Sequence, residues 1–294
     1  MESLDQARRE FAEKIRATAG LQSEALVRAF ATVPREAFVG PGPWKLLRPP
    51  YRSSYEITPD DDPRHLYDSV LVALDASRGL NNGEPTSLAR WLDILDLTPG
   101  NSVLHIGCGV GYYTAIIAEA VGPRGGVVGV EIDPELAERA RRDLIPWPNA
   151  TAICADGCEF SAGPFDVIFV NAGATEVLPN WLNNLRNEGR LLVPLTVDLP
   201  IPNVGLGHML LVMRRADVYA AKFVSPVGIF HCIGARTVQG NDLLQSAYKS
   251  GGHEEIRSLQ RGDHPCSPQC WFHARGFCLS RLPVDGEFTG DYKL

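Results

Sequence analysis

Residues 103–118 read VLHIGCGVGYYTAIIA, and this stretch decides the fold. An apolar run is followed by Gly107, Gly109 and Gly111, and a helical pattern starts at Tyr112. The glycines permit a sharp turn and let a ligand approach the backbone closely. The N-terminus of the following helix presents free N–H groups and a partial positive charge. The stretch therefore predicts a strand–loop–helix unit that binds a phosphate or a carboxylate.

Short apolar segments alternate with helical patterns beyond this unit. We predict strands at GGVVGVEI (125–132), ATAICAD (150–156), FDVIFVNA (165–172) and GRLLVPLT (189–196), and helices at 112–121, 134–144 and 178–185. HMLLVMRRA and DVYAAKFVS (208–225) predict an antiparallel hairpin that turns near Ala216-Asp217. This alternation is typical of an α/β fold. We expect a Rossmann-like, doubly wound and mostly parallel sheet that ends in an antiparallel hairpin.

The flanking segments are less regular. Apolar residues at helical spacing predict helices over 4–19 and 23–32, and Pro85 suits the first turn of another helix. Between them we expect a loop-rich arm at 40–63, a strand at 67–74 and a turn at 81–83. Past residue 240 we expect two helices, at 241–249 and 254–259, and a final strand at 270–280. These parts define N-terminal helices with an arm (1–80), the ligand-binding domain (81–226) and a C-terminal extension that packs on it (227–294).

Composition restricts the function classes. The chain has 294 residues, a formal net charge of -7 and a pI of about 5.5, which makes nucleic acid an unlikely partner. Arg139, Arg141 and Arg142 are expected on a solvated helix face. The chain contains no apolar run long enough for a membrane span and starts without a secretory signal, so we expect a cytoplasmic protein with reduced thiols.

The C-terminal extension contains cysteines and histidines at His264, Cys266, Cys270, His273 and Cys278. Zinc binds such residues in tetrahedral sets. The Cys-x3-Cys spacing with one later cysteine is irregular, however, and no second tight pair follows. We therefore predict no metal here, but a loop followed by a strand whose aromatic residues pack on the main domain: Trp271, Phe272 and Phe277.

Acidic residues follow the next two predicted strands. Glu131 ends one strand, where it could accept hydrogen bonds from ribose hydroxyls, and Asp156-Gly157 ends the next, where adenine would lie. Neighbouring strand ends in a doubly wound sheet converge on one cleft. The dinucleotide fingerprint G-x-G-x-x-G/A is the main competing interpretation, but Tyr112 stands where that pattern has glycine or alanine.

Several segments together resemble protein-L-isoaspartate O-methyltransferases. They are VPREAFVG (33–40), VLHIGCGVGYYTAIIA (103–118), VVGVEIDPELAERARRDL (127–144), ADG (155–157) and PFDVIFVNAGATEVLPNWLNNLRNEGRLLVPL (164–195). The resemblance implies a Rossmann-like fold that binds S-adenosylmethionine. It also implies O-methyl transfer to a carboxylate of a peptide or protein substrate.

The same resemblance assigns the expected site residues. Cofactor binding falls to Gly107, Cys108, Gly109, Gly111, Tyr112, Glu131, Ile132, Asp156, Gly157 and Asn171. The resemblance places four residues at the reaction centre, and no metal is expected there: Tyr67, Asp68, Asn82 and Asn171.

The chain departs from the family pattern at two positions. His105 stands where relatives carry an acidic residue, and a packed, hydrogen-bonded role is favoured over a catalytic one. Relatives have a threonine-isoleucine-serine-x-proline run whose serine helps to hold the isoaspartyl group, whereas this chain has Gly83 at the serine and Glu84 after it. Methylation of RNA or a small natural product, and an inactive cofactor-binding module, therefore stay open as alternatives, as does the oligomeric state.

Overall fold

The computed structural model describes residues 3–50, 54–274 and 276–284, in two compact units. Unit 1 comprises Met1–Asn101 and Cys108–Cys154, and unit 2 comprises Ser102–Gly107 and Ala155–Leu294. The chain passes from unit 2 into unit 1 inside the glycine loop, between Gly107 and Cys108. The three-part division expected from the sequence stays a prediction.

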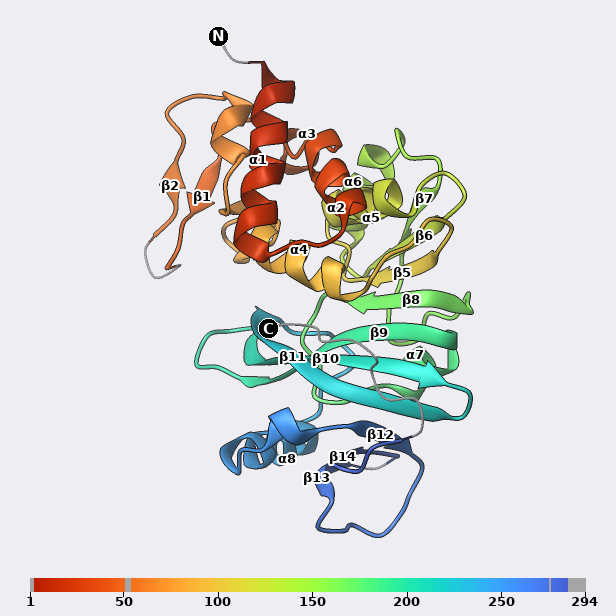
Figure 1. The fold of residues 1–294 in the computed structure, drawn as a ribbon. Helices are drawn as coiled ribbons and strands as arrows, with labels where there is room; N and C mark the ends of the chain where they lie inside the picture. Colours follow the sequence, from red (N-terminus) through yellow and green to blue (C-terminus); the bar gives the residue numbers. More distant parts are fainter. Residues whose placement is uncertain (1–2, 51–53, 275, 285–294) are drawn as a thin grey trace. The chain divides into compact units, whose positions relative to one another are not determined.

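Unit 1 begins with the two predicted helices, α1 (Leu4–Ala19) and α2 (Glu24–Thr32), which lie side by side (Figure 1). The side chains of Ser3 and Ser23 cap their N-termini. A short helix α3 (Glu36–Val39) follows, and α4 (Pro85–Ile94) starts at the predicted proline.

The arm predicted as loop contains strands instead. β1 (Lys45–Leu47), β2 (Glu56–Ile57), β3 (Leu71–Asp75) and β4 (Leu80–Asn81) form a sheet in the order β2-β1-β3-β4. A 3-10 turn, η1 (Pro63–Leu66), precedes β3, so the strand predicted at 67–74 begins later. The prediction was wrong because Trp44 and Leu46 are the only buried apolar residues in the described part of this segment, and so few apolar positions give no visible period. They pack beside Leu66, Val70 and Val72.

The remainder of unit 1 follows the predicted alternation. α5 (Tyr112–Val121), β6 (Gly126–Glu131), α6 (Pro134–Asp143) and β7 (Ala150–Cys154) occur in that order, and β6 pairs with β7 in parallel. α5 is buried over nearly its whole length, which explains its apolar sequence.

Unit 2 carries the other central strands. β5 (Ser102–Ile106) pairs in parallel with β8 (Phe165–Val170), and β8 pairs in parallel with β9 (Leu185–Asp198). The short helix α7 (Pro179–Asn183) precedes β9. β10 (Val204–Arg215) and β11 (Val218–Phe230) form the predicted antiparallel hairpin, which lies beside β9 (Figure 1). The predicted α/β class, mostly parallel with an antiparallel end, is confirmed.

Two of the secondary-structure predictions for the end of unit 2 were wrong. After α8 (Val238–Lys249), the segment predicted as a helix at 254–259 forms η2 (His253–Glu255) and then β12 (Ser258–Arg261). The single strand predicted at 270–280 is a hairpin of β13 (Cys270–Ala274) and β14 (Phe277–Ser280). Gly276, at φ 86°, supplies the left-handed residue that the turn requires.

Aromatic residues anchor this hairpin within unit 2, as expected. Trp271 packs edge-on against Phe223 of β11 and Tyr248 of α8, with ring centroids 5.4 and 5.3 Å away. Phe272 and Phe277 are buried and lie 5.4 Å apart. Along the described part of the chain, no helix has both the length and the apolar character needed to cross a membrane.

Candidate active site

The part of the glycine loop that belongs to unit 1, from Cys108 onward, leaves open space beside its backbone. Gly109 and Gly111 have φ angles of 56° and 90°, which favour glycine. A side chain at Gly111 would press on Leu144 at 3.2 Å, whereas one at Gly109 would enter open space. Gly111 begins α5 without a side-chain cap. The open space at Gly109 and the uncapped helix N-terminus therefore suit a ligand that approaches the backbone.

Glu131 ties the loop to the end of β6. Its Oε2 accepts the Gly109 N–H at 2.8 Å, and its Oε1 accepts the Asp133 N–H at 3.0 Å. The side chain is 8% exposed, and burial raises its pKa despite these backbone bonds. Each carboxylate oxygen keeps a lone pair, so the residue can still accept hydroxyl hydrogens from a bound ribose.

The other predicted cofactor residues of unit 1 differ in exposure. Ile132, directly after Glu131, is 40% exposed, so its side chain is accessible to an apolar ring such as adenine. Cys108 is buried, and burial raises the pKa of its thiol, so it is not a nucleophile. Tyr112 is also buried, between Phe38 and Tyr113, which leaves its backbone as the part that reaches the loop.

Asn171 holds the unit 2 side of the loop. Its N–H donates to the Ile106 carbonyl at 2.8 Å, and its Nδ2 donates to the Gly107 carbonyl at 3.5 Å. Gly107 has a φ of 74°, and a side chain there would approach the Asn171 carbonyl at 3.2 Å. The ends of β5 and β8 are thus fixed to each other.

The turn after β7 is also built around close contacts in unit 2. The Asp156 Oδ1 accepts the Cys158 N–H at 2.8 Å. A side chain at Gly157 would lie 2.4 Å from Ile106, so only glycine fits. The Gly157 carbonyl accepts the Trp181 Nε1–H at 3.0 Å. The predicted cofactor residues thus form two groups, one in each unit, and each group is held in place by contacts within its own unit. Their convergence on one cleft stays a prediction.

His105 is a packing residue in unit 2. It is fully buried, and its ring stacks on Phe169 with centroids 5.1 Å apart. Burial lowers its pKa to about 3, so the imidazole is neutral at physiological pH. Without a route to solvent, it cannot exchange a proton with a substrate. The expected packed role is confirmed.

Tyr67 and Asp68, predicted near the reaction centre, have structural partners in unit 1. The Tyr67 hydroxyl donates to the Glu36 carboxylate. Asp68 accepts from Lys14 Nζ at 2.7 Å and from Arg48 Nη1 at 3.1 Å. Both side chains are therefore already engaged in fixing their own segment.

Arg35 organises this region, although the sequence did not single it out. The side chain is fully buried in unit 1. Its two terminal nitrogens donate to four carbonyl oxygens, at 2.7 to 3.2 Å: those of Leu66, Asp68, Val70 and Gly83. Arg35 lies in the VPREAFVG segment, so the available signal was a pair of charged residues, Arg35 and Glu36, inside an otherwise apolar motif. It joins residues 66–70 to the segment before α4.

Glu84 and Asn82 have separate roles in that segment. Glu84 caps α4: its carboxylate accepts the N–H groups of Thr86 and Ser87 at 2.9 and 2.8 Å. Its charge is therefore turned to the helix N-terminus, where the dipole stabilises it. Asn82 is 6% exposed, and its buried Nδ2 has no acceptor among the described residues. The Asn82 amide therefore has hydrogen-bond donors that no described protein group uses.

Gly83 cannot be replaced by serine without strain. Its φ is 70°, and an added Cβ would lie 3.3 Å from both Leu88 and Tyr113. We expect Gly83→Ser to lower the free energy of unfolding by about 2–3 kcal/mol, from the left-handed backbone and from crowding. Gly79→Ser is the matched control, because Gly79 has a φ of 72° but open space around it. Urea unfolding checks both variants, and equal losses would contradict the crowding contribution.

A surface pocket of about 330 Å³ elsewhere in unit 1 contains none of the predicted site residues. It lies beside α3 and α6 and is lined by Ala37, Val39, Gly40, Pro41, Leu74, Arg139, Arg142 and Asp143. Neither the glycine loop nor Glu131 borders it, so we assign it no part in cofactor binding.

Comparison with known proteins agrees with this geometry. The family model for protein-L-isoaspartate(D-aspartate) O-methyltransferase matches residues 6–200. The enzyme of that name from Methanothermobacter thermautotrophicus is 32% identical over 73% of this chain and 89% of its own length. Protein-L-isoaspartate O-methyltransferase 1 of Archaeoglobus fulgidus is 35% identical over 65% of this chain and 80% of its own.

Solved structures support the same fold. A protein-L-isoaspartate O-methyltransferase aligns with a TM-score of 0.63 and 23% identity, over 87% of this chain and 71% of its own. A Plasmodium falciparum structure, described as a protein of this kind in complex with S-adenosyl-L-homocysteine, aligns with a TM-score of 0.58 and 17% identity, over 76% of this chain and 97% of its own.

The fold, the glycine loop and the acidic residue Glu131 at the end of β6 together define a Rossmann-like, S-adenosylmethionine-dependent methyltransferase. The residues present fit that cofactor, because Gly109 leaves space beside the loop and Glu131 keeps acceptor capacity. The chain belongs to the protein-L-isoaspartate(D-aspartate) O-methyltransferase family.

Proposed function

We propose that this protein transfers a methyl group to a carboxylate of a peptide or protein, and that the acceptor is an isoaspartyl residue, as the names of its relatives state. The single observation that carries the carboxylate assignment is the buried Asn82 amide, whose Nδ2 lacks an acceptor in the described structure. An amide donor suits an anionic oxygen.

The burial of His105 agrees with a carboxylate acceptor. A carboxylate is already ionised at neutral pH and needs no proton removed, whereas a hydroxyl or amine acceptor often needs a general base. His105, the histidine nearest the loop in sequence, is buried and neutral. The protein therefore has to orient the acceptor and exclude water rather than move a proton.

The cofactor supplies a methyl group on a sulfonium sulfur: as an acceptor oxygen bonds to that carbon, the carbon–sulfur bond breaks and its electron pair stays on sulfur. Within unit 1, Glu131 and the loop from Cys108 to Gly111 would hold the ribose and the methionine carboxylate, and Ile132 would border adenine. Asn82 would donate to the acceptor carboxylate. Glu84 does not oppose this anion, because helix α4 binds its charge.

Two peptides of one sequence, one with an isoaspartyl residue and one with aspartate, test the proposal. Incubation with the enzyme and S-adenosylmethionine should add the mass of one methyl group to the isoaspartyl peptide, and mild base should remove it as an ester. Methylation of neither peptide, with cofactor binding intact, would contradict the isoaspartyl assignment. A base-stable product would contradict the carboxylate assignment.

Substitution of Asn82 tests its assigned role. We expect Asn82→Ala to lower kcat/KM for the isoaspartyl peptide about 10- to 100-fold, the value of one hydrogen bond to a charged group. Asn82→Asp should lower it further, because a carboxylate would face the anionic acceptor. Steady-state kinetics measure both, with the Kd for S-adenosylhomocysteine as the control that should not change. Equal activity of all three proteins would remove Asn82 from the acceptor site.

A further inference from the structure

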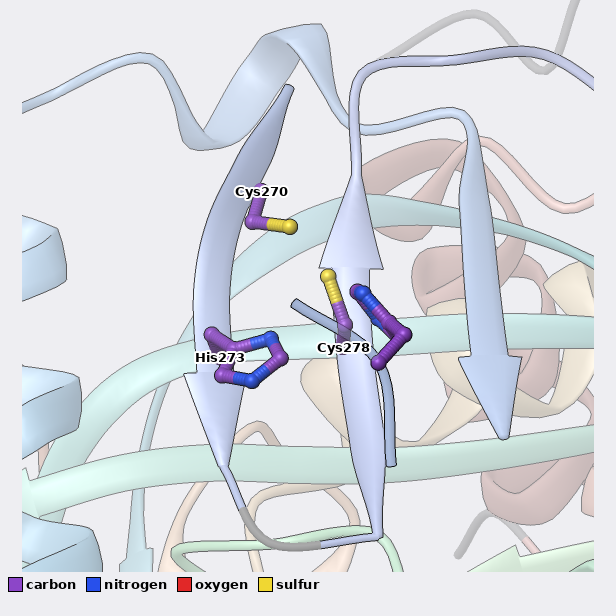
Figure 2. A group of neighbouring side chains, drawn as sticks. Cys270, His273 and Cys278 are labelled. Carbon is purple, nitrogen blue, oxygen red and sulfur yellow. The ribbon is translucent and has the colours of Figure 1, made fainter. Parts of the chain in front are cut away.

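The end of unit 2 gathers four side chains that bind metals, although the sequence predicted no metal there. One ligand atom from each of His264, Cys270, His273 and Cys278 lies within 4.8 Å of all the others. Figure 2 shows Cys270 and His273 on one strand and Cys278 on its neighbour, with the three side chains close together. The cluster lies outside residues 6–200, so the family match does not account for it.

An irregularity in β13 brings Cys270 and His273 together. Residues three apart on a regular strand point to opposite faces. Here the register with β14 shifts between Cys270 and Phe272, and such a bulge reverses the alternation. His273 lies directly opposite Cys278 in the register, within reach of a shared ion. The spacing that looked irregular in the sequence is therefore a Cys-x2-His pair facing a cysteine on the next strand.

The loop before β13 supplies the fourth residue, and backbone bonds fix its ends. The Gly262 N–H donates to the Gly276 carbonyl at 2.9 Å, and the Gly276 N–H donates to Asp263 Oδ1 at 3.2 Å. The rings of His264 and His273 then lie edge to face, with centroids 4.8 Å apart. His264, rather than the exposed Cys266, completes the set.

Each of the two histidines, His264 and His273, has a ring nitrogen that is available to bind a ligand. His264 Nδ1 lies 2.9 Å from the Pro265 carbonyl, an arrangement that leaves the lone pair on Nε2. His264 Nε2 and His273 Nδ1 are buried without a hydrogen-bond partner in the described part of the chain. Unpartnered buried nitrogens cost free energy unless a ligand binds them.

Ser267 prepares the thiol of Cys270. The Ser267 N–H donates to Cys270 Sγ at 3.4 Å, and its hydroxyl lies 3.5 Å from the same sulfur. Metals bind thiolates rather than thiols, and hydrogen-bond donors beside the sulfur stabilise the thiolate form.

We propose that His264, Cys270, His273 and Cys278 form a structural Zn²⁺ site. Two thiolates and two imidazoles are ligands that zinc prefers, whereas calcium and magnesium prefer oxygen. Ligand atoms in a tetrahedral zinc site lie about 3.3–3.8 Å apart, given Zn–N and Zn–S bonds of about 2.0–2.3 Å. The present cluster needs only a small inward rotation to reach that geometry. Four protein ligands leave no open position, so the ion ties the loop to the hairpin and takes no part in catalysis.

Binding is coupled to proton release. Zinc takes the place of the thiol protons of Cys270 and Cys278, which pass to solvent. The affinity for zinc therefore falls as the pH is lowered.

Metal analysis and alkylation of the native protein test the proposal without mutation. Protein purified without chelator, or incubated with Zn²⁺ and then desalted, should contain one zinc per chain by inductively coupled plasma mass spectrometry. Brief iodoacetamide treatment and peptide mapping should then label Cys266 but not Cys270, until chelation frees the Cys270 thiol; Cys278 is buried even without the ion and is not used as a reporter. Absence of zinc after both preparations, or equal labelling of Cys266 and Cys270 with zinc present, would overturn the proposal.

Matched serine substitutions separate the site from its neighbours. Cys270→Ser and Cys278→Ser should lose the zinc, whereas Cys266→Ser and Cys154→Ser, at exposed cysteines outside the set, should keep it. If the first two variants do not fold, Co²⁺ substitution of the wild-type protein still decides. The thiolate-to-cobalt absorption band of a tetrahedral site is expected, and the octahedral spectrum of free Co²⁺ would overturn the proposal.

Discussion

Glu131→Ala is expected to weaken binding of S-adenosylmethionine by about 100-fold or more. The carboxylate would accept hydrogen bonds from two ribose hydroxyls, and each hydrogen bond to a charged group contributes about 1.5–3 kcal/mol. The same carboxylate accepts the Gly109 and Asp133 N–H groups, so its removal also frees the loop. Both effects weaken the binding of S-adenosylmethionine.

Isothermal titration calorimetry with S-adenosylmethionine measures this loss. Glu135→Ala is the control, because Glu135 is an exposed glutamate in the first turn of α6 and should bind the cofactor like the wild type. Glu131→Gln keeps the shape of the side chain but brings an NH2 group against a backbone N–H, so it should also bind weakly. Circular dichroism establishes that each variant is folded. Unchanged affinity in Glu131→Ala would remove this residue from the cofactor site.

Arg35→Met is expected to have the largest effect on stability, a loss of about 3–5 kcal/mol in the free energy of unfolding. Methionine keeps most of the apolar volume but removes every donor. The four carbonyl oxygens that Arg35 binds would stay buried without those bonds. Such a loss is a large share of the stability of an ordinary domain.

The midpoint of urea unfolding reports this change, with the slope checked for two-state behaviour. Arg28→Met serves as the control, because Arg28 lies on the exposed face of α2 and should change stability by less than about 0.5 kcal/mol. Arg35 also fixes the Gly83 carbonyl, so the variant should lose peptide methylation more than cofactor binding. Equal midpoints for the two variants would show that the buried network contributes little.

The central elements could be predicted from sequence because each carries its own local signal. The strands around the glycine loop are short apolar runs, and α5 starts where the glycines end. Ser3 and Ser23 mark helix starts by side-chain caps that depend only on neighbouring residues. The residues proposed to bind the cofactor carry the same kind of local signal, since they follow strand ends.

Features that depend on distant contacts were missed. The strands β1 and β2 bury too little to show a period, and β12 becomes a strand only by pairing with β11 and β14. The role of Arg35 depends on carbonyls 31 to 48 residues away. The metal-binding cluster depends on a bulge in β13, which moves His273 to the face of Cys270. Glu84 was expected near the substrate, and only its bonds to the start of α4 show where its charge lies.

The most direct test of the central claim is transfer of tritium from S-[methyl-³H]adenosylmethionine to an isoaspartyl peptide, followed by release of volatile methanol in mild base. We predict that the wild type labels the peptide, that base releases the label as methanol, and that Glu131→Ala labels it far more slowly. Label that resists base, or no label on any peptide by an enzyme that binds the cofactor, would contradict carboxyl methylation of peptides.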